Sequence, residues 1–142
     1  MGTTIYDVLE MFGRKYIIIL VALLFLLVCN TVVAFEIDSE GIVTYVVDGD
    51  SLDVYATSGF GAETTYRIRL ADINAPEMST SEGVVAKQVL KNLVEGKHVY
   101  IDVDDITTYD LYDRVVAVVY LPVNDTHAMN INYYMVLNAT WF

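Results

Sequence analysis

Cysteine and histidine are both scarce in this chain of 142 residues, which has one cysteine and two histidines. The single cysteine, Cys29, excludes an intrachain disulfide. It follows Val28, whereas we would expect the cysteine of a lipoprotein to follow a small residue, so we interpret Cys29 as a passive side chain of an apolar segment. His98 and His127 are far apart in sequence, and we interpret both as surface or strand residues rather than metal ligands.

Positive charge is also scarce, because 8 Lys and Arg residues are outnumbered by 19 Asp and Glu residues and the net charge is −11. Residues 36–142 contain six of the basic and seventeen of the acidic residues, so they carry the net charge of the whole chain. Non-specific binding of nucleic acid depends on many Lys and Arg contacts with phosphates. The composition therefore argues against a broad surface for nucleic acid and predicts that any phosphate chemistry is local and metal-assisted.

One long apolar run interrupts this polar composition. Arg14 and Lys15 precede thirteen apolar residues without a charge, YIIILVALLFLLV, at positions 16–28. This order is typical of a signal peptide, here with a cleavage site after Ala34. Alternatively, residues 16–35 provide the twenty residues that a transmembrane anchor needs to cross about 30 Å of hydrocarbon. The weak polarity near the end of the run favours the uncleaved anchor.

Both interpretations place the rest of the chain outside the cytoplasm, because Arg14 and Lys15 stay on the cytoplasmic side. We therefore expect four parts along the chain. They are a short N-terminal segment (1–15), the transmembrane or signal segment (16–35), a solvated linker (36–40) and a folded domain (41–142). The chain has no internal repeats and no low-complexity segment apart from the apolar run.

The folded domain is predicted to be mainly β, since short runs rich in β-branched and aromatic residues recur between turn signals. The expected strands are 42–47, 51–56, 64–73, 98–104 and 114–122. Glycine-containing turns at 48–50 and 58–61 separate the first three strands. This arrangement is typical of an antiparallel meander.

Two helices are expected among these strands. Ser79 and Glu82 are spaced as a capping box, apolar residues recur at helical spacing from Val85 to Val94, and Gly96 is a stop signal. A second, weakly signalled helix is predicted over 129–138. The succession indicates an α+β, mainly β fold, namely a five-stranded OB-type barrel with a helix between strands three and four, a short C-terminal helix and a preceding N-terminal hydrophobic helix.

Three polar clusters carry the candidate chemistry: VVDGDS at 46–51, RIRLADINAPE at 67–77 and YDRVVAVVY at 112–120. Each alone has an ordinary structural explanation, as a tight turn, an ion pair on a strand or a charge that protects a strand edge. Together they supply hard oxygen ligands in Asp50 and Asn74, arginines that can grip phosphate, and a free carboxylate in Glu77. In-line attack on a phosphodiester requires this combination.

The three clusters, their order and the β-β-β-α-β-β succession resemble the staphylococcal nuclease (thermonuclease-like) family, whose fold is an OB barrel. The resemblance runs from about Gly41 to Trp141. The clusters are similar, in turn, to the family patterns V-x-D-G-D-[TS], R-L-x-x-[IV]-[DN]-[TA]-P-E and Y-[GD]-R. The resemblance implies a nuclease that hydrolyses DNA and RNA phosphodiesters with Ca²⁺ and leaves 3′-phosphates.

The resemblance also implies a metal site. Asp50 corresponds to a calcium ligand, Asn74 to a position where the family commonly has a second carboxylate ligand, and Ala75 to a residue whose backbone carbonyl reaches the metal. Asn74 keeps an oxygen ligand but lacks a negative charge. We therefore expect weaker calcium binding than with two carboxylates, although a neutral ligand does not abolish a hard-cation site.

The residues of the proposed reaction correspond in the same way. Arg69 and Arg114 match the arginines that contact the scissile phosphate, and Glu77 matches the general base or water-orienting group. Tyr112 matches a tyrosine that contacts the nucleotide. Arg67 has no assigned role and is expected to support the charge of its neighbour or to pair with an acid.

Two further departures from the family affect stability and substrate capture. The chain ends at Phe142, soon after the helix that matches the family's second, so the family's closing segment, with its tyrosines and third helix, has no counterpart. The family's best-known member is also basic, whereas this domain is acidic. We expect weak or salt-sensitive capture of the substrate.

These observations favour a Ca²⁺-dependent endonuclease that is membrane-anchored or secreted, acts on nucleic acid and has no obligate protein partner. The alternative is a non-catalytic OB-fold module that binds nucleic acid or protein. A truncated, poorly folding remnant is a third interpretation. The presence of Arg69, Glu77 and Arg114 together favours the enzyme, because a degenerate domain would be expected to lose these residues first.

Overall fold

The computed structural model describes residues 36–138 together with Gly13, Tyr16 and Ile19. Almost all of the expected N-terminal segment 1–15 and of the hydrophobic segment 16–35 lies outside these residues, as does the cleavage site after Ala34. Among the described residues, no helix is long and apolar enough to cross a membrane.

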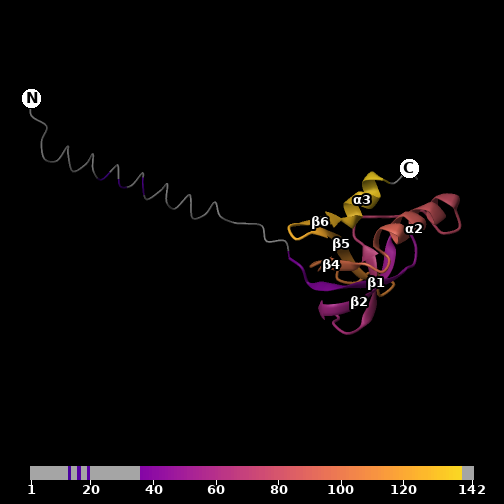
Figure 1. The fold of residues 1–142 in the computed structure, drawn as a ribbon, viewed down its shortest axis with the longest axis horizontal. Helices are drawn as coiled ribbons and strands as arrows, with labels where there is room; N and C mark the ends of the chain where they lie inside the picture. Colours follow the sequence, from indigo (N-terminus) through magenta and orange to yellow (C-terminus); the bar gives the residue numbers. More distant parts are fainter. Residues whose placement is uncertain (1–12, 14–15, 17–18, 20–35, 139–142) are drawn as a thin grey trace, which may run out of the picture. The chain divides into compact units, whose positions relative to one another are not determined.

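Residues 36–138 fold into strands and helices that alternate much as the sequence predicts (Figure 1). In chain order the elements are β1 (Ser39–Val46), β2 (Ser51–Gly59), β3 (Thr65–Leu70), α2 (Ser81–Val94), β4 (His98–Val103), β5 (Val115–Asn124), β6 (His127–Asn130) and α3 (Ile131–Leu137). The strands wind around one another, with α2 packed beside β1 and α3 beside β5.

The sheet closes on itself. Its strand order is β3-β2-β1-β4-β5-β6, and β3 also pairs with β5 in parallel, through Ile68–Val115, Arg69–Val116 and Leu70–Ala117. The antiparallel pairs β1–β2 and β2–β3 confirm the predicted meander. Five strands therefore form a closed barrel with α2 between the third and fourth, which confirms the predicted OB-type architecture.

The barrel interior is filled by alternating side chains of the strands, because successive residues of a strand point to opposite faces. Along β5, Val115, Ala117, Val119 and Leu121 are buried while the residues between them are partly exposed. Burying a Val or Leu side chain stabilises a fold by about 1.5–3 kcal/mol. The hydrophobic effect therefore fixes which face of β5 points inward.

The structure corrects the predicted start of the first helix. Thr80, not Ser79, is the N-cap, and its Oγ1 accepts a hydrogen bond from the Gly83 N–H at 3.1 Å. Glu82 does not complete a capping box; its carboxylate instead accepts a hydrogen bond from the Ser81 hydroxyl. The predicted stop at Gly96 is confirmed by its left-handed backbone, with φ +76°.

Several strand and helix boundaries also differ from prediction. Strand β1 begins at Ser39, which pairs with Gly59 and Ile101, so it includes part of the stretch expected to be a linker. Strand β3 ends at Leu70 instead of Ile73, because the chain turns there, with Asp72 at φ 58°. The C-terminal helix α3 begins at Ile131, since the preceding residues form β6, which pairs with β5.

A buried asparagine in α3 ties these elements together. Asn132 is 7% exposed, and its Nδ2 donates to the carbonyls of Ala71 (3.0 Å) and Ala117 (3.1 Å). Its Oδ1 accepts a hydrogen bond from the Val119 N–H at 3.0 Å. One side chain therefore joins α3 to β5 and to the residue that follows β3.

We expect Asn132→Ala to lower the free energy of unfolding by about 1–3 kcal/mol, because the buried N–H of Val119 would lose its partner. Urea unfolding would measure the change. Asn92→Ala on the exposed surface of α2 is the matched control and should change stability by less than about 0.5 kcal/mol. Equal stability of the two variants would contradict this role of Asn132.

Candidate active site

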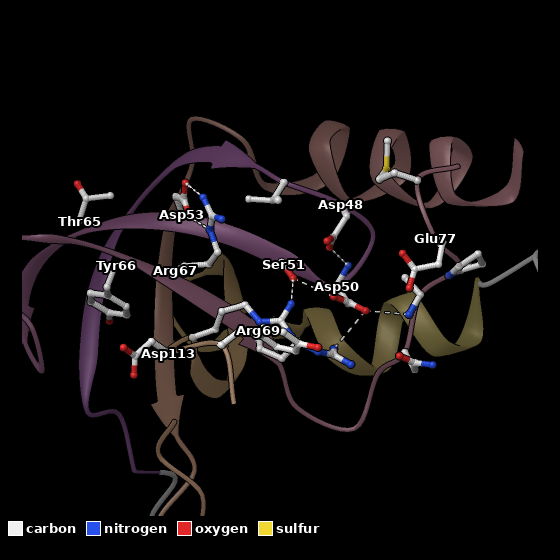
Figure 2. A pocket seen from close by; sticks show the side chains of 17 residues that line it. Asp48, Asp50, Ser51, Asp53, Thr65, Tyr66, Arg67, Arg69, Glu77 and Asp113 are labelled. Atoms are coloured by element: carbon white, nitrogen blue, oxygen red, sulfur yellow. Dashed lines mark hydrogen bonds and ion pairs between the residues drawn. The ribbon is translucent and has the colours of Figure 1, made fainter. Parts of the chain in front are cut away.

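A cleft of about 770 Å³ opens on one side of the barrel. All three polar clusters of the sequence line it, and every residue predicted for the site is among its walls. These residues are Asp50, Arg69, Asn74, Ala75, Glu77, Tyr112 and Arg114. Figure 2 shows Asp48 and Glu77 beside Asp50 at one end, and Asp53, Thr65, Tyr66 and Arg67 at the other.

The turn before β2 places Asp50 in the cleft. The Asp48 carboxylate accepts a hydrogen bond from the Asp50 N–H at 3.0 Å, a local bond that stabilises tight turns. The conformational role expected for this turn therefore falls on Asp48. Asp50 itself is only 8% exposed, although it carries a carboxylate.

Three donors surround the Asp50 carboxylate. Its Oδ1 accepts from the Ser51 hydroxyl at 2.9 Å, and its Oδ2 accepts from the Ala75 N–H at 2.9 Å and lies 3.3 Å from Arg69 Nη1. Burial raises the pKa of Asp50 above its ordinary value, while the hydrogen bonds from Ala75 and Ser51 and the charge of Arg69 act in the opposite direction. Burial prevails, so the ionised carboxylate is held in the fold at a cost in stability.

Arg114 reaches the same carboxylate through Ser51. Its Nη1 donates to Ser51 Oγ at 2.9 Å, while its Nε and Nη2 lie 2.7 and 2.6 Å from Asp110 Oδ2. Partial burial raises the pKa of Asp110, but hydrogen bonds from Arg114 and from the Tyr112 N–H prevail and keep it below its ordinary value. Asp110 therefore stays ionised and fixes the guanidinium of Arg114.

Arg69 approaches from the neighbouring strand. Its side chain is 18% exposed, and its Nη1 also donates to the Leu70 carbonyl at 3.0 Å. Its Nε and Nη2 have no partner among residues 36–138, so they are available as donors to a ligand in the cleft. The two arginines predicted for the site thus meet around the Asp50–Ser51 pair.

The turn before β5 presents an aromatic ring beside Arg114. Asp113 has a left-handed backbone with φ 62°, which reverses the chain between Tyr112 and Arg114. Tyr112 is 79% exposed, and its ring centroid lies 5.4 Å from the Arg114 guanidinium carbon. Tyr112 therefore lies on the rim of the cleft, where a flat ligand can stack on it.

Glu77 is positioned through its backbone. Its carbonyl accepts hydrogen bonds from the Thr80 N–H at 2.9 Å and from the Thr80 hydroxyl at 2.8 Å. A Cβ added to Gly83 would lie 2.1 Å from the same carbonyl, so only glycine lets α2 pack this closely. The start of α2 thus determines where the exposed Glu77 side chain enters the cleft.

The oxygen donors of the cleft are compatible with a hard cation. A carboxylate has about four lone-pair sites, and three donors approach Asp50, so one site remains for a metal. The Asn74 amide and the Ala75 peptide also line the cleft. Within the described part of the chain, no group of three or more His, Cys, Asp or Glu side chains could hold a metal ion.

Sequence analysis missed two residues that shape the site. Ser51 links Asp50 to Arg114, and Asp110 holds Arg114 by two nitrogens. Ser51 belongs to the VVDGDS cluster and follows Asp50 directly, so the sequence does carry a signal for its place beside that carboxylate. The pairing of Asp110 with Arg114 depends on the turn between them and has no distinct signal in the sequence.

We expect Asp50→Asn to raise the midpoint of thermal unfolding at neutral pH in the presence of a chelator, because it removes the buried charge. The raised pKa means that ionised Asp50 destabilises the folded state. This penalty is present above the folded-state pKa and disappears below the ordinary value of 3.8. The gain should therefore shrink as the melts are repeated at decreasing pH. Asp125→Asn in an exposed turn is the control, and a lower midpoint for Asp50→Asn at neutral pH would refute the expectation.

Comparison with known proteins identifies relatives of the chain. A family model described as "Staphylococcal nuclease homologue" matches residues 67–139. A micrococcal nuclease of Shigella flexneri is 36% identical over 103 residues, which are 70% of this chain and 55% of that protein. A protein named "uncharacterized endonuclease" from Escherichia coli is 35% identical over 108 residues, which are 73% of this chain and 61% of that protein.

The chain thus spans little more than half the length of these relatives. The family match includes the part of the site from Arg67 to Arg114. It extends through β5 to α3, which are the elements that close and brace the barrel. The chain belongs to the staphylococcal nuclease homologue family.

Proposed function

We propose that this protein is a Ca²⁺-dependent nuclease that hydrolyses phosphodiester bonds of DNA, RNA or both. The observation that carries the proposal is the meeting of Arg69 and Arg114 around Asp50, with Glu77 in the same cleft. Two similar proteins are named as nucleases, one of them a micrococcal nuclease and the other an endonuclease.

The two arginines would bind the scissile phosphate. Arg69 has N–H donors without a partner among residues 36–138, and Arg114 is held in a fixed orientation by Asp110. Guanidinium groups match phosphate oxygens with paired hydrogen bonds. Donors that are fixed before the reaction stabilise the negative charge that grows on phosphorus in the transition state.

Glu77 would handle the attacking water. Its side chain is exposed in the cleft while its backbone is fixed by Thr80 and Gly83, so the carboxylate is accessible but positioned. It would accept the water proton as the oxygen attacks phosphorus, and the bond from phosphorus to the 5′ oxygen would break. The leaving 5′ oxygen would take up a proton from solvent, so the products would be a 3′-phosphate and a free 5′-hydroxyl.

Asp50, Asn74 and Ala75 would hold the calcium ion. Their donors are a carboxylate, an amide oxygen and a backbone carbonyl, all of them hard oxygens of the kind that Ca²⁺ prefers. A bound cation would polarise a phosphoryl oxygen and stabilise its charge. With one carboxylate among the three, we expect millimolar rather than micromolar calcium to be required, by analogy with the weakest protein sites of about 10⁻⁴–10⁻³ M.

The alternative is a non-catalytic OB-fold module. It is favoured by the net charge of −11 and by the acidic partners of both site arginines, Asp50 and Asp110. Such a module would bind nucleic acid or protein in the cleft without cleaving a bond. Calcium dependence of cleavage separates the two functions.

We expect the purified protein to cleave single-stranded DNA or RNA in Ca²⁺ and to lose this activity in a chelator. Arg69→Ala and Arg114→Ala should each lower kcat about 10²–10³-fold, as deletion of one oxyanion donor does. Glu77→Gln should also reduce cleavage strongly, because an amide cannot accept the proton of the attacking water. Gel assays of labelled oligonucleotides would measure the rates.

Lys97→Ala is the matched control, because it removes an exposed positive charge outside the cleft. Its rate should equal that of the wild type, and thermal melts should show that all variants are folded. Calcium-dependent binding without cleavage would support the non-catalytic module instead. Wild-type rates in both arginine variants would refute the proposed mechanism.

We further propose that the domain acts outside the cytoplasm, either anchored in a membrane by residues 16–35 or secreted after cleavage following Ala34. The proposal rests on the basic residues and apolar run of the sequence. Protease added to intact cells should digest an anchored domain, and a secreted one should be found in the medium. Protection of the domain until the cells are lysed would contradict this location.

A further inference from the structure

Arg67 forms a second charged pair in the cleft that the proposed reaction leaves unused. Its Nε donates to Asp53 Oδ1 at 2.7 Å and its Nη2 donates to Asp53 Oδ2 at 3.0 Å. The two side chains are 47% and 20% exposed. Both line the same cleft as Arg69 and Glu77, so the pair faces the space in which a substrate would lie.

The position of Arg67 on β3 suits an extended nucleic acid. Arg67 and Arg69 lie on the same face of the strand, two residues apart, which corresponds to about 6.8 Å. This spacing is comparable to the distance between neighbouring phosphates of an extended single strand. On the neighbouring strand β2, Asp53 lies opposite Arg67 and Ser51 lies opposite Arg69.

The cleft continues beyond the proposed scissile position. Figure 2 shows it running from Glu77 past Asp50 and Ser51 to Asp53 and Arg67. Tyr66 and Thr65 follow at its far end. A strand of more than one phosphate can therefore lie along β3, with its backbone passing both arginines.

The pair with Asp53 is of a kind that phosphate can replace. Exposed ion pairs stabilise a fold only weakly, because both groups are well solvated when apart. A phosphate offers the guanidinium the same two-point geometry that the carboxylate offers now. Asp53 therefore holds Arg67 in a suitable orientation and also competes with the ligand for it.

We propose that Arg67 binds the phosphate next to the scissile one, and that Asp53 lowers the affinity of this subsite by occupying Arg67 when no nucleic acid is present. The ligand class is a single-stranded oligonucleotide with at least two phosphodiesters. The inference rests on the proposed function for its choice of scissile position, but its binding step can be measured without cleavage.

Binding of a labelled tetranucleotide tests the subsite, measured by fluorescence anisotropy over a range of salt concentrations in a Glu77→Gln background. Arg67→Gln should weaken binding about tenfold and reduce the slope of log K against log salt by about 0.7, the value for one phosphate contact to a single strand. Arg67→Lys should keep most of this slope, because it keeps the charge. Lys97→Gln is the matched control and should leave the affinity and the slope unchanged.

Asp53→Asn tests the competition. It should tighten binding of the tetranucleotide when Arg67 is present, and the gain should disappear when Arg67→Gln is added. A gain that persists without Arg67 would mean that Asp53 acts only by repelling phosphate and would overturn the competition.

Cleavage rates provide a second measurement. In the active protein, Arg67→Gln should raise KM for the tetranucleotide more than it lowers kcat, and should reduce the preference for the tetranucleotide over a dinucleotide with one phosphodiester. An unchanged salt slope and an unchanged preference would refute the subsite even if the wild type cleaves. Binding that depends on Arg67 in a protein that cleaves nothing would refute the nuclease and leave the subsite in place.

Discussion

The parallel pairing of β3 with β5 is the constraint on which the rest of the molecule depends. It closes the barrel, and it brings Arg69 at the end of one strand close to Arg114 at the start of the other. Parallel neighbours cannot be joined by a tight turn, so this contact is long-range and its closure entropy must be offset by burial. Ile68, Leu70 and Val115, all buried at the junction, supply that burial, and Asn132 braces the carbonyls on both sides of it.

The partly buried charged groups of the cleft lower the stability of the barrel. A chain of contacts runs from Asp110 through Arg114 and Ser51 to Asp50 and Arg69, and it holds two cations and two carboxylates in partly buried positions. Each member fixes the next, so the groups are oriented in the absence of a ligand. Burial raises the pKa of Asp50 even though hydrogen bonds from Ala75 and Ser51 and the charge of Arg69 lower it, so burial of the ionised carboxylate costs stability. Such trade-offs are expected where binding and catalysis require buried charge.

Much of the fold and of the site could be predicted from local sequence, because strands and tight turns carry local signals. The alternating apolar residues of β5 and the glycine turn before Asp50 are examples. The predicted N-cap is wrong because the spacing of Ser79 and Glu82 fits a capping box, whereas in the fold the Thr80 hydroxyl accepts from the Gly83 N–H and donates to the Glu77 carbonyl. Strand β6 has only four residues, none of them buried, so its pairing with β5 defines it. Asn132 and Asp110 act through partners that only the folded chain brings near.

Glycine at position 83 disfavours helix formation but allows the start of α2 to pack closely on the backbone of Glu77. Alanine is a better helix former than glycine by about 1 kcal/mol, so an engineer who optimised α2 for stability would replace Gly83 early. The added methyl group would press on the backbone carbonyl of Glu77 and shift the Glu77 side chain in the cleft, although position 83 itself is buried outside the cleft. Helix propensity alone is therefore a poor guide at position 83, because the substitution it favours would disturb both the packing of α2 and the position of Glu77 in the cleft.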